Sequence, residues 1–562
     1  MFRRTHELDG DDLDEQQRLA RIVLYRNVQT QIMKLRDSQF SLPRVTTTIA
    51  SLNKLAKFGK SYEIYERPFT KICKPFLKSS GYGSREELCQ GMFEIYGPYV
   101  WGILANHEII PKSACQTLGF CKNTKKINVP SLLGNKPKEQ PSSRSTTKRR
   151  KRTLQTEFRI LHVTDIHIDD EYAQGSPTEC GLIICCRTEY SGSGSAGQYG
   201  HFNCNTPQAT LDVLIDAMRN LSQPPDFIVF TGDTAPHNIW SDSLESHKHH
   251  TEYVVDQLKT MISGVPVYPA FGNHEGFPSS MYHAELPETK IYNANISNWW
   301  SELFTMDEGN DETIKSAVYY ATDTPVSGLK VLSLNTMFGY AWNYYVLLND
   351  QTPQYKEQWD FAESILADAR INNEKVVIIG HHSPGIETDI VPGYSTRYSE
   401  LVHKYSDVIL LQLFGHTHDD HFVLTSSPDV EVKTGVSFIA PSVTPFGGTN
   451  PSFRVYYLDE ITHELLDYDQ YRMNLDAAND GSPMVELVYS AMDEYDLPDM
   501  SAQSWHDFTN RLLEDDDLFN RYWNNKLTGT MQEECDQKCR LKEICKLRSS
   551  SWDVVDQCLK LL

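Results

Sequence analysis

Five short stretches of this chain each end a run of apolar, β-branched residues with a side chain that can bind a metal ion. They are Asp165-Ile-His167, Gly232-Asp233, Gly272-Asn273-His274-Glu275, Gly380-His381-His382 and Gly415-His416-Thr417-His418. Apolar runs of this length predict buried strands, and ligands of open α/β sheets bind at the carboxyl ends of such strands. The pattern therefore predicts an α/β fold in which these side chains meet at one site.

Seven of these side chains offer oxygen or nitrogen atoms that suit Zn, Mn or Fe, and they are Asp165, His167, Asp233, Asn273, His381, His416 and His418. Within each of the pairs 165/167 and 416/418, the two residues can point the same way from an extended segment. Seven ligands are too many for one ion and suit two ions that share a carboxylate, for which Asp233 is the best candidate. Because paired cations activate water for attack on phosphorus, the pattern predicts a two-metal hydrolase.

Further polar side chains lie next to these ligands. His274 is expected to be a general acid that protonates the leaving oxygen, and His237 is expected to contact a phosphate oxygen. Glu275 and His382 are predicted to support the ligands rather than to bind metal. A further group on a predicted helix is expected to form a solvated face, and its members are His247, His249 and His250.

The charge and the cysteines narrow the class of protein. A net charge of −22 argues against nucleic acid as a partner, since phosphate backbones need clustered Lys and Arg. No apolar run is long enough to predict a transmembrane span. The 12 cysteines form three groups of four, at 73–121, 180–204 and 535–558, which predicts local disulfides and an oxidising compartment, with zinc binding by thiolates as the alternative. Two sequons, at Asn220 and Asn295, would accept glycans there.

Changes in composition divide the chain into five predicted parts. They are a charged tail (1–44), a helical unit (45–122), a basic linker with Pro and Ser (123–153), an α/β domain (154–472) and a helical C-terminal subdomain (473–562). The linker ends in Lys148–Arg152, which is interpreted as a solvated tether, a site of proteolytic processing or a contact with anionic lipid.

Apolar periodicity predicts the elements of the α/β domain. The expected strands are 158–163, 227–231, 265–271, 330–334, 375–379 and 408–414. The expected helices include 209–220, 246–262 and 354–371.

The motifs DxH, GD, GNHE, GHH and GHTH, in this order, resemble those of the calcineurin-like metallophosphoesterases. The segments Val265–Glu275 and Ala440–Phe446, the run Cys185-Cys-Arg187 and the last four cysteines narrow the similarity to the acid sphingomyelinase family. The N-terminal helical unit is similar to a saposin domain, a module that engages lipid, although it has four cysteines where such domains have six.

The resemblance implies a metallophosphoesterase β-sandwich flanked by helices, and it implies roles for single residues. One zinc ion would be held by Asp165, His167, Asp233 and His418, and the other by Asp233, Asn273, His381 and His416. The implied disulfides are Cys180–Cys185, Cys186–Cys204, Cys535–Cys539 and Cys545–Cys558.

The resemblance also implies a function. It is hydrolysis of sphingomyelin to ceramide and phosphocholine by a secreted or lysosomal enzyme that uses two Zn²⁺ (with Mn²⁺ or Fe as alternatives) and meets the membrane through its saposin-like domain. No signal peptide is visible in 1–19. Two alternatives stay open: a related phosphodiesterase that acts on nucleotides or other soluble diesters, and a lipid-binding protein without catalysis.

Overall fold

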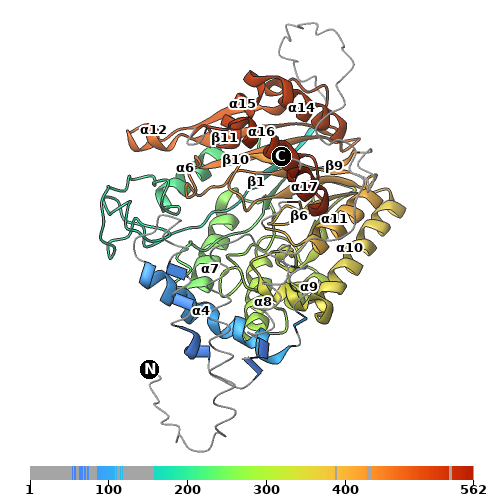
Figure 1. Cartoon of the computed structure of the whole chain (residues 1–562). Helices are drawn as coiled ribbons and strands as arrows, with labels where there is room; N and C mark the ends of the chain where they lie inside the picture. Colours follow the sequence, from blue (N-terminus) through green and yellow to red (C-terminus); the bar gives the residue numbers. More distant parts are fainter. Residues whose placement is uncertain are drawn as a thin grey trace, which may run out of the picture.

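A computed structural model describes residues 157–385, 389–426, 433–530, 534–560 and 562, together with 85–107 and a few shorter pieces between 53 and 117. The predicted tail, the linker, Cys115 and Cys121 lie outside the described residues. In Figure 1, the main body has two sheets with helices on their outer sides, and the N-terminal helices lie against the lower edge of that body.

The first sheet has the strand order β12-β11-β10-β1-β2-β3. Its strands are β1 (Glu157–Val163), β2 (Phe227–Phe230), β3 (Val267–Pro269), β10 (Ser452–Asp459), β11 (Leu465–Met473) and β12 (Val485–Ser490). The strands β1, β2 and β3 run parallel, so their carboxyl ends meet at one edge. Strand β10 pairs antiparallel with β1 and connects it to the C-terminal part of the chain.

The second sheet has the order β4-β5-β6-β7-β9-β8. Its strands are β4 (Tyr320–Asp323), β5 (Leu329–Ser333), β6 (Lys375–Ile379), β7 (Ile409–Phe414), β8 (His421–Ser426) and β9 (Lys433–Ile439). The central strands β5, β6, β7 and β9 are parallel, and their buried residues are mostly Val, Ile and Leu, as expected for strands covered on both faces.

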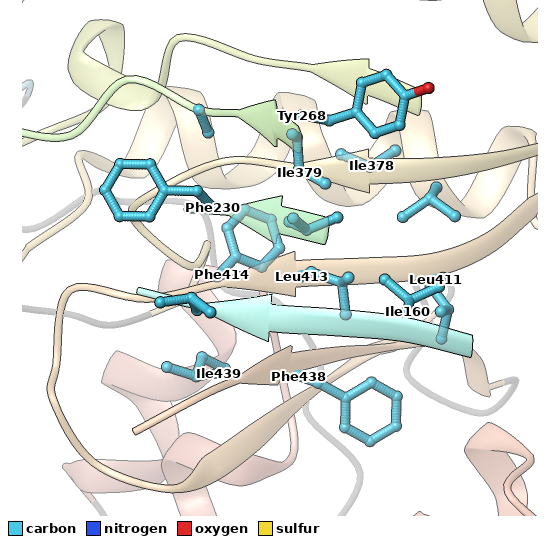
Figure 2. Close-up of a cluster of buried hydrophobic side chains, with 14 of the residues drawn as sticks. Ile160, Phe230, Tyr268, Ile378, Ile379, Leu411, Leu413, Phe414, Phe438 and Ile439 are labelled. Atoms are coloured by element: carbon cyan, nitrogen blue, oxygen red, sulfur yellow. The ribbon is translucent and has the colours of Figure 1, made fainter. Parts of the chain in front are cut away.

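The two sheets share one hydrophobic core. Figure 2 shows side chains from both sheets meeting between them, with Ile160 and Phe230 from the first sheet and Ile378, Leu413 and Phe438 from the second. All five are at most 3% exposed to solvent. This packing aligns the strand ends of one sheet with those of the other, and the sandwich that the resemblance implies is confirmed.

Helices cover the outer faces of the sandwich. They are α6 (Gln208–Arg219), α7 (Leu244–Met261), α8 (Pro287–Trp300), α9 (Glu308–Ala317), α10 (Pro353–Asn372) and α11 (Pro392–Lys404), with the 3₁₀ helices η2 (Thr336–Phe338) and η3 (Tyr344–Gln351). Helix α10 shows why such segments begin and end where they do. Pro353 fits its first turn, and Asn373 ends it in the left-handed conformation.

The C-terminal part is mostly helical, and it adds the strand β12 to the first sheet. Its helices are α12 (Leu475–Asn479), α13 (Ala491–Glu494), α14 (Ala502–Glu514), α15 (Asp516–Lys526), α16 (Gln537–Leu547) and α17 (Trp552–Leu559). Helix α14 buries Trp505, Phe508 and Leu512, which lie on one helical face, against strands β8 and β9.

The described N-terminal residues include η1 (Tyr62–Tyr65) and α4 (Arg85–Asn106). Helix α4 packs against the main body at two places. Leu88 contacts a cluster that contains Trp240, and Ile103 contacts a cluster that contains Met281 and Tyr345. A disulfide joins Cys73 to Cys89 at the first of these places.

The histidines of α7 differ from expectation. His249 is exposed, but His247 and His250 are only 1% and 5% exposed, so the prediction of a solvated face is wrong for both. The reason is that neighbouring segments pack on these two rings. His247 bonds Asp242 and lies 5.4 Å from the ring of Phe277, and His250 lies 3.1 Å from Asp170.

Candidate metal centre

The seven predicted ligands all follow strand ends. Asp165 and His167 come after β1, Asp233 after β2, and Asn273 after β3. In the second sheet, His381 follows β6, and His416 and His418 follow β7. Because the two sheets are packed with these ends together, the structure brings all seven side chains to one place.

The backbone around these residues is strained. Five of the seven have positive φ angles, between 41° and 74°: Asp165, His167, Asp233, His416 and His418. Residues other than glycine rarely adopt this backbone conformation, which costs on the order of 1–3 kcal/mol for each residue. Such strain concentrates at functional sites, where the surrounding structure holds it in place.

The two aspartates are fixed by hydrogen bonds. Asp165 accepts bonds from Thr164 Oγ1 (2.6 Å) and from the amide of His416 (3.0 Å). Asp233 accepts a bond from the amide of His274 (2.8 Å). Burial alone would favour the neutral acid, but His381 and the other imidazoles around them lower the pKa of both carboxyls well below the usual range, so both are charged.

Two glycines leave room for these carboxylates. A Cβ on Gly272 would lie 2.2 Å from Asp233 Oδ1, and a Cβ on Gly415 would lie 2.5 Å from Asp165 Oδ2. Any larger residue would displace the charged groups, which explains the glycines that precede Asn273 and His416.

Glu275 connects the loops that follow β2 and β3. Its carboxylate accepts hydrogen bonds from the amides of Asp233 (2.9 Å), Thr234 (2.6 Å) and Gly272 (2.7 Å). It therefore ties the loop after β2 to the loop after β3. This geometry matches the supporting role predicted for it.

Three imidazoles present their Nε2 atoms to the carboxylates. His167, His381 and His418 each place Nδ1 at 2.7–2.8 Å from a backbone carbonyl, of Ala235, Thr231 and Phe446 respectively. Because a carbonyl only accepts, Nδ1 carries the hydrogen, and in the neutral ring Nε2 keeps a lone pair. This is the arrangement that metal-binding histidines use.

The lone pairs face oxygen atoms that are also acceptors. His381 Nε2 lies 3.0 Å from Asp233 Oδ2 and 3.1 Å from Asn273 Oδ1. His418 Nε2 lies 3.4 Å from Asp165 Oδ1, and His167 Nε2 lies 3.4 Å from Asp233 Oδ2. His167 Nε2 is buried without a hydrogen-bond partner among the described atoms.

A positive charge between the imidazole nitrogens and the carboxylate oxygens would stabilise these contacts. Burial opposes a charge on His381, yet Asp233 and Asp165 raise its pKa to about 9. The hydrogen bond with Asp165 likewise raises the pKa of His418 in spite of burial. The residues present therefore fit metal cations, which satisfy the carboxylates and the lone pairs together.

His416 reaches the site from the second sheet. Its ring lies 5.1 Å from that of His381 and 4.3 Å from that of His382, so it belongs to the cluster that could hold a second ion. Its Nε2 also lies 3.8 Å from Asp389. Tyr340 stacks on His382 at 4.1 Å and closes this side of the site.

The two histidines predicted for catalysis lie beside the ligands. The rings of His237 and His274 are 4.5 Å apart, and they lie 4.0 Å and 4.6 Å from the ring of His167. Burial, with the neighbouring imidazoles, lowers the pKa of each well below the usual range, although Asp233 opposes this at His274. Both rings are therefore neutral in the absence of a ligand.

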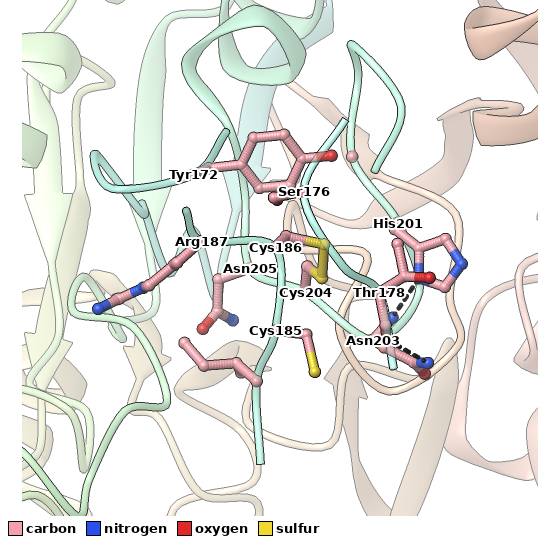
Figure 3. Close-up of a disulfide and its surroundings, with 12 residues drawn as sticks. Tyr172, Ser176, Thr178, Cys185, Cys186, Arg187, His201, Asn203, Cys204 and Asn205 are labelled. Carbon is pink, nitrogen blue, oxygen red and sulfur yellow. Dashed lines mark hydrogen bonds between the residues drawn. A yellow bond between two sulfur atoms is a disulfide. The ribbon is translucent and has the colours of Figure 1, made fainter. Parts of the chain in front are cut away.

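His237 is held by the disulfide-bonded loop. Asn205 Oδ1 accepts from the amide of His237, and its Nδ2 lies 2.8 Å from His237 Nδ1. Asn205 follows Cys204, whose bond to Cys186 ties this loop together, as Figure 3 shows. The other implied pairs are joined as well: Cys180–Cys185, Cys535–Cys539 and Cys545–Cys558.

Some features of the site carried no signal in the sequence. Asn205, Tyr340 and Asp389 lie in loops with no motif, and only the tertiary structure brings them to the histidines. The two sequons lie on helices, with Asn220 exposed at the end of α6 and Asn295 half-buried on α8, and their glycosylation stays a prediction.

Known proteins share these features. The family model of the calcineurin-like phosphoesterases matches residues 158–420, and that of the acid sphingomyelin phosphodiesterase C-terminal region matches 432–561. Sphingomyelin phosphodiesterase A of Dictyostelium discoideum is 31% identical over 84% of this chain and 83% of its own length. Sphingomyelin phosphodiesterase of Bos taurus is 32% identical over 72% of this chain and 66% of its own length. A cyclic GMP-AMP phosphodiesterase of Homo sapiens is 28% identical over 71% of this chain and 90% of its own length.

The two-sheet fold and the His/Asp cluster at its strand ends define a calcineurin-like metallophosphoesterase. With the C-terminal match and the relatives above, the chain belongs to the acid sphingomyelin phosphodiesterase family. It is therefore an enzyme, a phosphoric diester hydrolase. Among the helices that the structure describes, none is both long enough and apolar enough to cross a bilayer.

Proposed function

We propose that this enzyme hydrolyses sphingomyelin to ceramide and phosphocholine with two Zn²⁺ ions. The observation that carries the proposal is the set of buried Nε2 lone pairs that face the charged carboxylates of Asp165 and Asp233. The sphingomyelin phosphodiesterases among its relatives support the substrate. Two zinc ions fit a donor set of imidazole, carboxylate and amide without thiolate.

We assign the ligands by the contacts of their atoms. Asp165, His167 and His418 converge as one group, and Asp165, Asp233 and His381 converge as another. Asp233 lies closer to His167 (3.4 Å) and His381 (3.0 Å) than Asp165 does (3.8 Å and 3.9 Å), so Asp233 would be the carboxylate that the two ions share. Asn273 and His416, which both contact His381, would complete the second ion's set.

When bound, the two ions supply Lewis acidity toward the phosphodiester and toward the attacking water. The chain's own residues hold and orient this site. Asp165 and Asp233 keep their charge because amides and hydroxyls solvate them, and Glu275 keeps the two loops in register. His237, fixed by Asn205 and 4.0 Å from the ring of His167, would contact a phosphate oxygen.

His274 is the proton donor in this proposal. Its backbone amide binds Asp233, so the ring is fixed beside the bridging position, and its Nδ1 is buried without a hydrogen-bond partner among the described atoms. The negative charge of an incoming phosphodiester favours the protonated imidazole. The leaving oxygen of ceramide can then take that proton, which avoids the release of an alkoxide.

We further propose that the N-terminal helical unit acts as a saposin-like lipid module and that the enzyme is secreted or lysosomal. Helix α4 packs on Trp240, three residues beyond His237, and so lies next to the site. The disulfides in the described residues suit an oxidising compartment.

A substrate panel with metal analysis tests the proposal. Purified protein is assayed on sphingomyelin, phosphatidylcholine, ATP and cyclic GMP-AMP, and its metal content is measured in parallel. We expect release of phosphocholine from sphingomyelin and two zinc ions for each chain. Preferential hydrolysis of a nucleotide would instead establish the second candidate, which the 28% identical cyclic GMP-AMP phosphodiesterase favours.

A further inference from the structure

Trp342 is a large apolar side chain that the fold leaves in solvent. It is 53% exposed, whereas the nearby Tyr340 and Tyr345 are 6% and 7% exposed. Water contact with an indole ring costs free energy that burial would recover. A partner that buries this exposed tryptophan would therefore gain binding free energy.

The loop that carries Trp342 is held firmly in place. The side chain of Asn343, which is 1% exposed, accepts bonds from the amides of Tyr282 (3.1 Å) and Tyr345 (3.3 Å). It also donates to the carbonyls of Tyr282 (3.0 Å) and Met337 (2.9 Å). The amide of Ala341 binds the carbonyl of Asp389 at 2.8 Å. The indole is thus presented by a fixed support.

This loop joins the metal centre to the N-terminal helices. On one side of Trp342, Tyr340 stacks on His382 and lies 5.2 Å from the ring of His416. On the other side, Tyr344 packs against the hydrophobic cluster that includes Ile103 of α4. Trp342 consequently lies on the rim between the site and the proposed lipid module.

Other exposed apolar residues belong to the same region. Ile110 is 60% exposed and follows Ile109, a buried member of that cluster. Ile291 is 58% exposed and lies on α8, which begins just after Leu286, another residue packed on the cluster. In Figure 1, α8 and α4 lie next to each other at the lower end of the molecule. Ile371, Ile461 and Met484, also exposed, lie on other elements.

We propose that Trp342 is a membrane anchor of the catalytic domain, which inserts at the headgroup level of a zwitterionic phospholipid surface. The inference rests on the proposed function, because the substrate of that function lies in such a surface. A chain with a net charge of −22 gains little from anionic lipid, so apolar insertion suits it better than charge attraction. Tryptophan is the side chain enriched at membrane–water interfaces, where its ring sits among the headgroups.

Vesicle binding tests the anchor. Full-length protein and Trp342→Ala are cosedimented with phosphatidylcholine vesicles, and we expect binding of the variant to weaken about tenfold with little dependence on salt. Ile461→Ala, which removes an even more exposed apolar residue (84%) from another part of the molecule, is the matched control and should bind like the unchanged protein. Thermal unfolding and metal content of Trp342→Ala exclude a general loss of structure.

Quenching by brominated lipid gives a second measurement that does not depend on affinity. Bromine in the upper acyl chain should quench part of the tryptophan fluorescence of the unchanged protein, and that part should disappear in Trp342→Phe, which keeps an apolar ring. Equal vesicle binding by Trp342→Ala, or equal quenching in Trp342→Phe, would overturn the anchor. Binding through Trp342 without release of phosphocholine would refute the proposed function and leave the anchor standing.

Discussion

The first and second sheets contribute to the metal centre in different ways. The first sheet supplies both carboxylates, and its loops hold one another through Glu275 and the amide of His274. The second sheet supplies histidines whose supports come from distant parts of the chain. His381 binds the carbonyl of Thr231 in the first sheet, and the amide of His416 binds Asp165.

The C-terminal helices also support His418, one of the histidines of the second sheet. The amide of Asp420, two residues beyond His418, binds the carbonyl of Lys526 on α15 at 2.9 Å. Lys526 in turn lies 2.7 Å from Glu543 on α16. The comparison teaches that the loops after β2 and β3 hold Asp233 within the first sheet, whereas Asp165 and the histidines of the second sheet depend on contacts between the sheets and with the C-terminal helices.

The largest effect is expected from Asp233→Asn. Asparagine keeps the size of the side chain but removes the charge that both imidazoles face. Activity should fall by at least about 1,000-fold and both ions should be lost, as measured by turnover and metal content. Asp212→Asn, an exposed change on α6, is the control and should alter neither. Turnover close to that of the unchanged protein would refute the bridging role.

His274→Ala should separate chemistry from metal binding. The loss of a proton donor slows hydrolysis by roughly 100- to 10,000-fold, while the ions stay because no ligand is removed. The effect should shrink for a diester whose leaving group is a nitrophenolate, since that group leaves without a proton. Loss of metal in this variant would make His274 a ligand instead.

Glu275→Gln tests whether Glu275 holds together the loops that follow β2 and β3. The neutral amide offers one acceptor oxygen where the carboxylate offers two, so at least one of the three backbone amides loses its partner. We expect a loss of about 1–3 kcal/mol in the free energy of unfolding and a tenfold to hundredfold loss of activity. Urea unfolding and turnover measure the two effects. An unchanged unfolding midpoint would contradict the bracing role.

Lys526→Met tests whether the C-terminal helices support the histidines of the second sheet. Methionine leaves Glu543 buried without its cation, which costs roughly 3–5 kcal/mol of stability and should weaken metal binding more than it slows a fully loaded enzyme. The double variant Lys526→Met with Glu543→Gln should recover part of the stability. Lys560→Met, on the exposed side of α17, is the matched control.

The last effect concerns acid stability rather than activity. Burial favours the neutral form of Glu543, but Lys526 outweighs it and lowers the carboxyl pKa from 4.5 to about 2. A lowered pKa stabilises the fold above about pH 4.5, and this contribution, on the order of 3 kcal/mol, is lost as the pH falls towards 2. Urea unfolding at pH 5 and pH 3 should therefore show a smaller difference in Glu543→Gln than in the unchanged protein. An equal difference in the two proteins would show that the Lys526–Glu543 pair does not contribute to acid stability.

Much of the sandwich could be predicted from apolar runs. The expected strand 375–379 is found at those residues, and the strands before the other four motifs are found within a few residues of prediction. These runs are buried on both faces, so their pattern depends little on the rest of the structure. The strands β8 to β12 could not be placed in the same way, because polar and aromatic residues interrupt their apolar runs. The pairing of β10 with β1 also joins segments that lie far apart in the sequence.

The site divides along similar lines. Ligands that follow a strand can be predicted because the end of the strand fixes their position. His247 and His250 could not be interpreted from helical periodicity, since the carboxylates that bury them come from loops. The contact of Asp389 with His416 likewise depends on how two loops of the second sheet meet.

Anomalous diffraction from crystals grown with zinc tests the central claim most directly. The account predicts two zinc peaks on either side of the Asp233 carboxylate, one beside His167 and His418 and the other beside His381 and His416. A single peak, or two peaks that do not share Asp233, would contradict it.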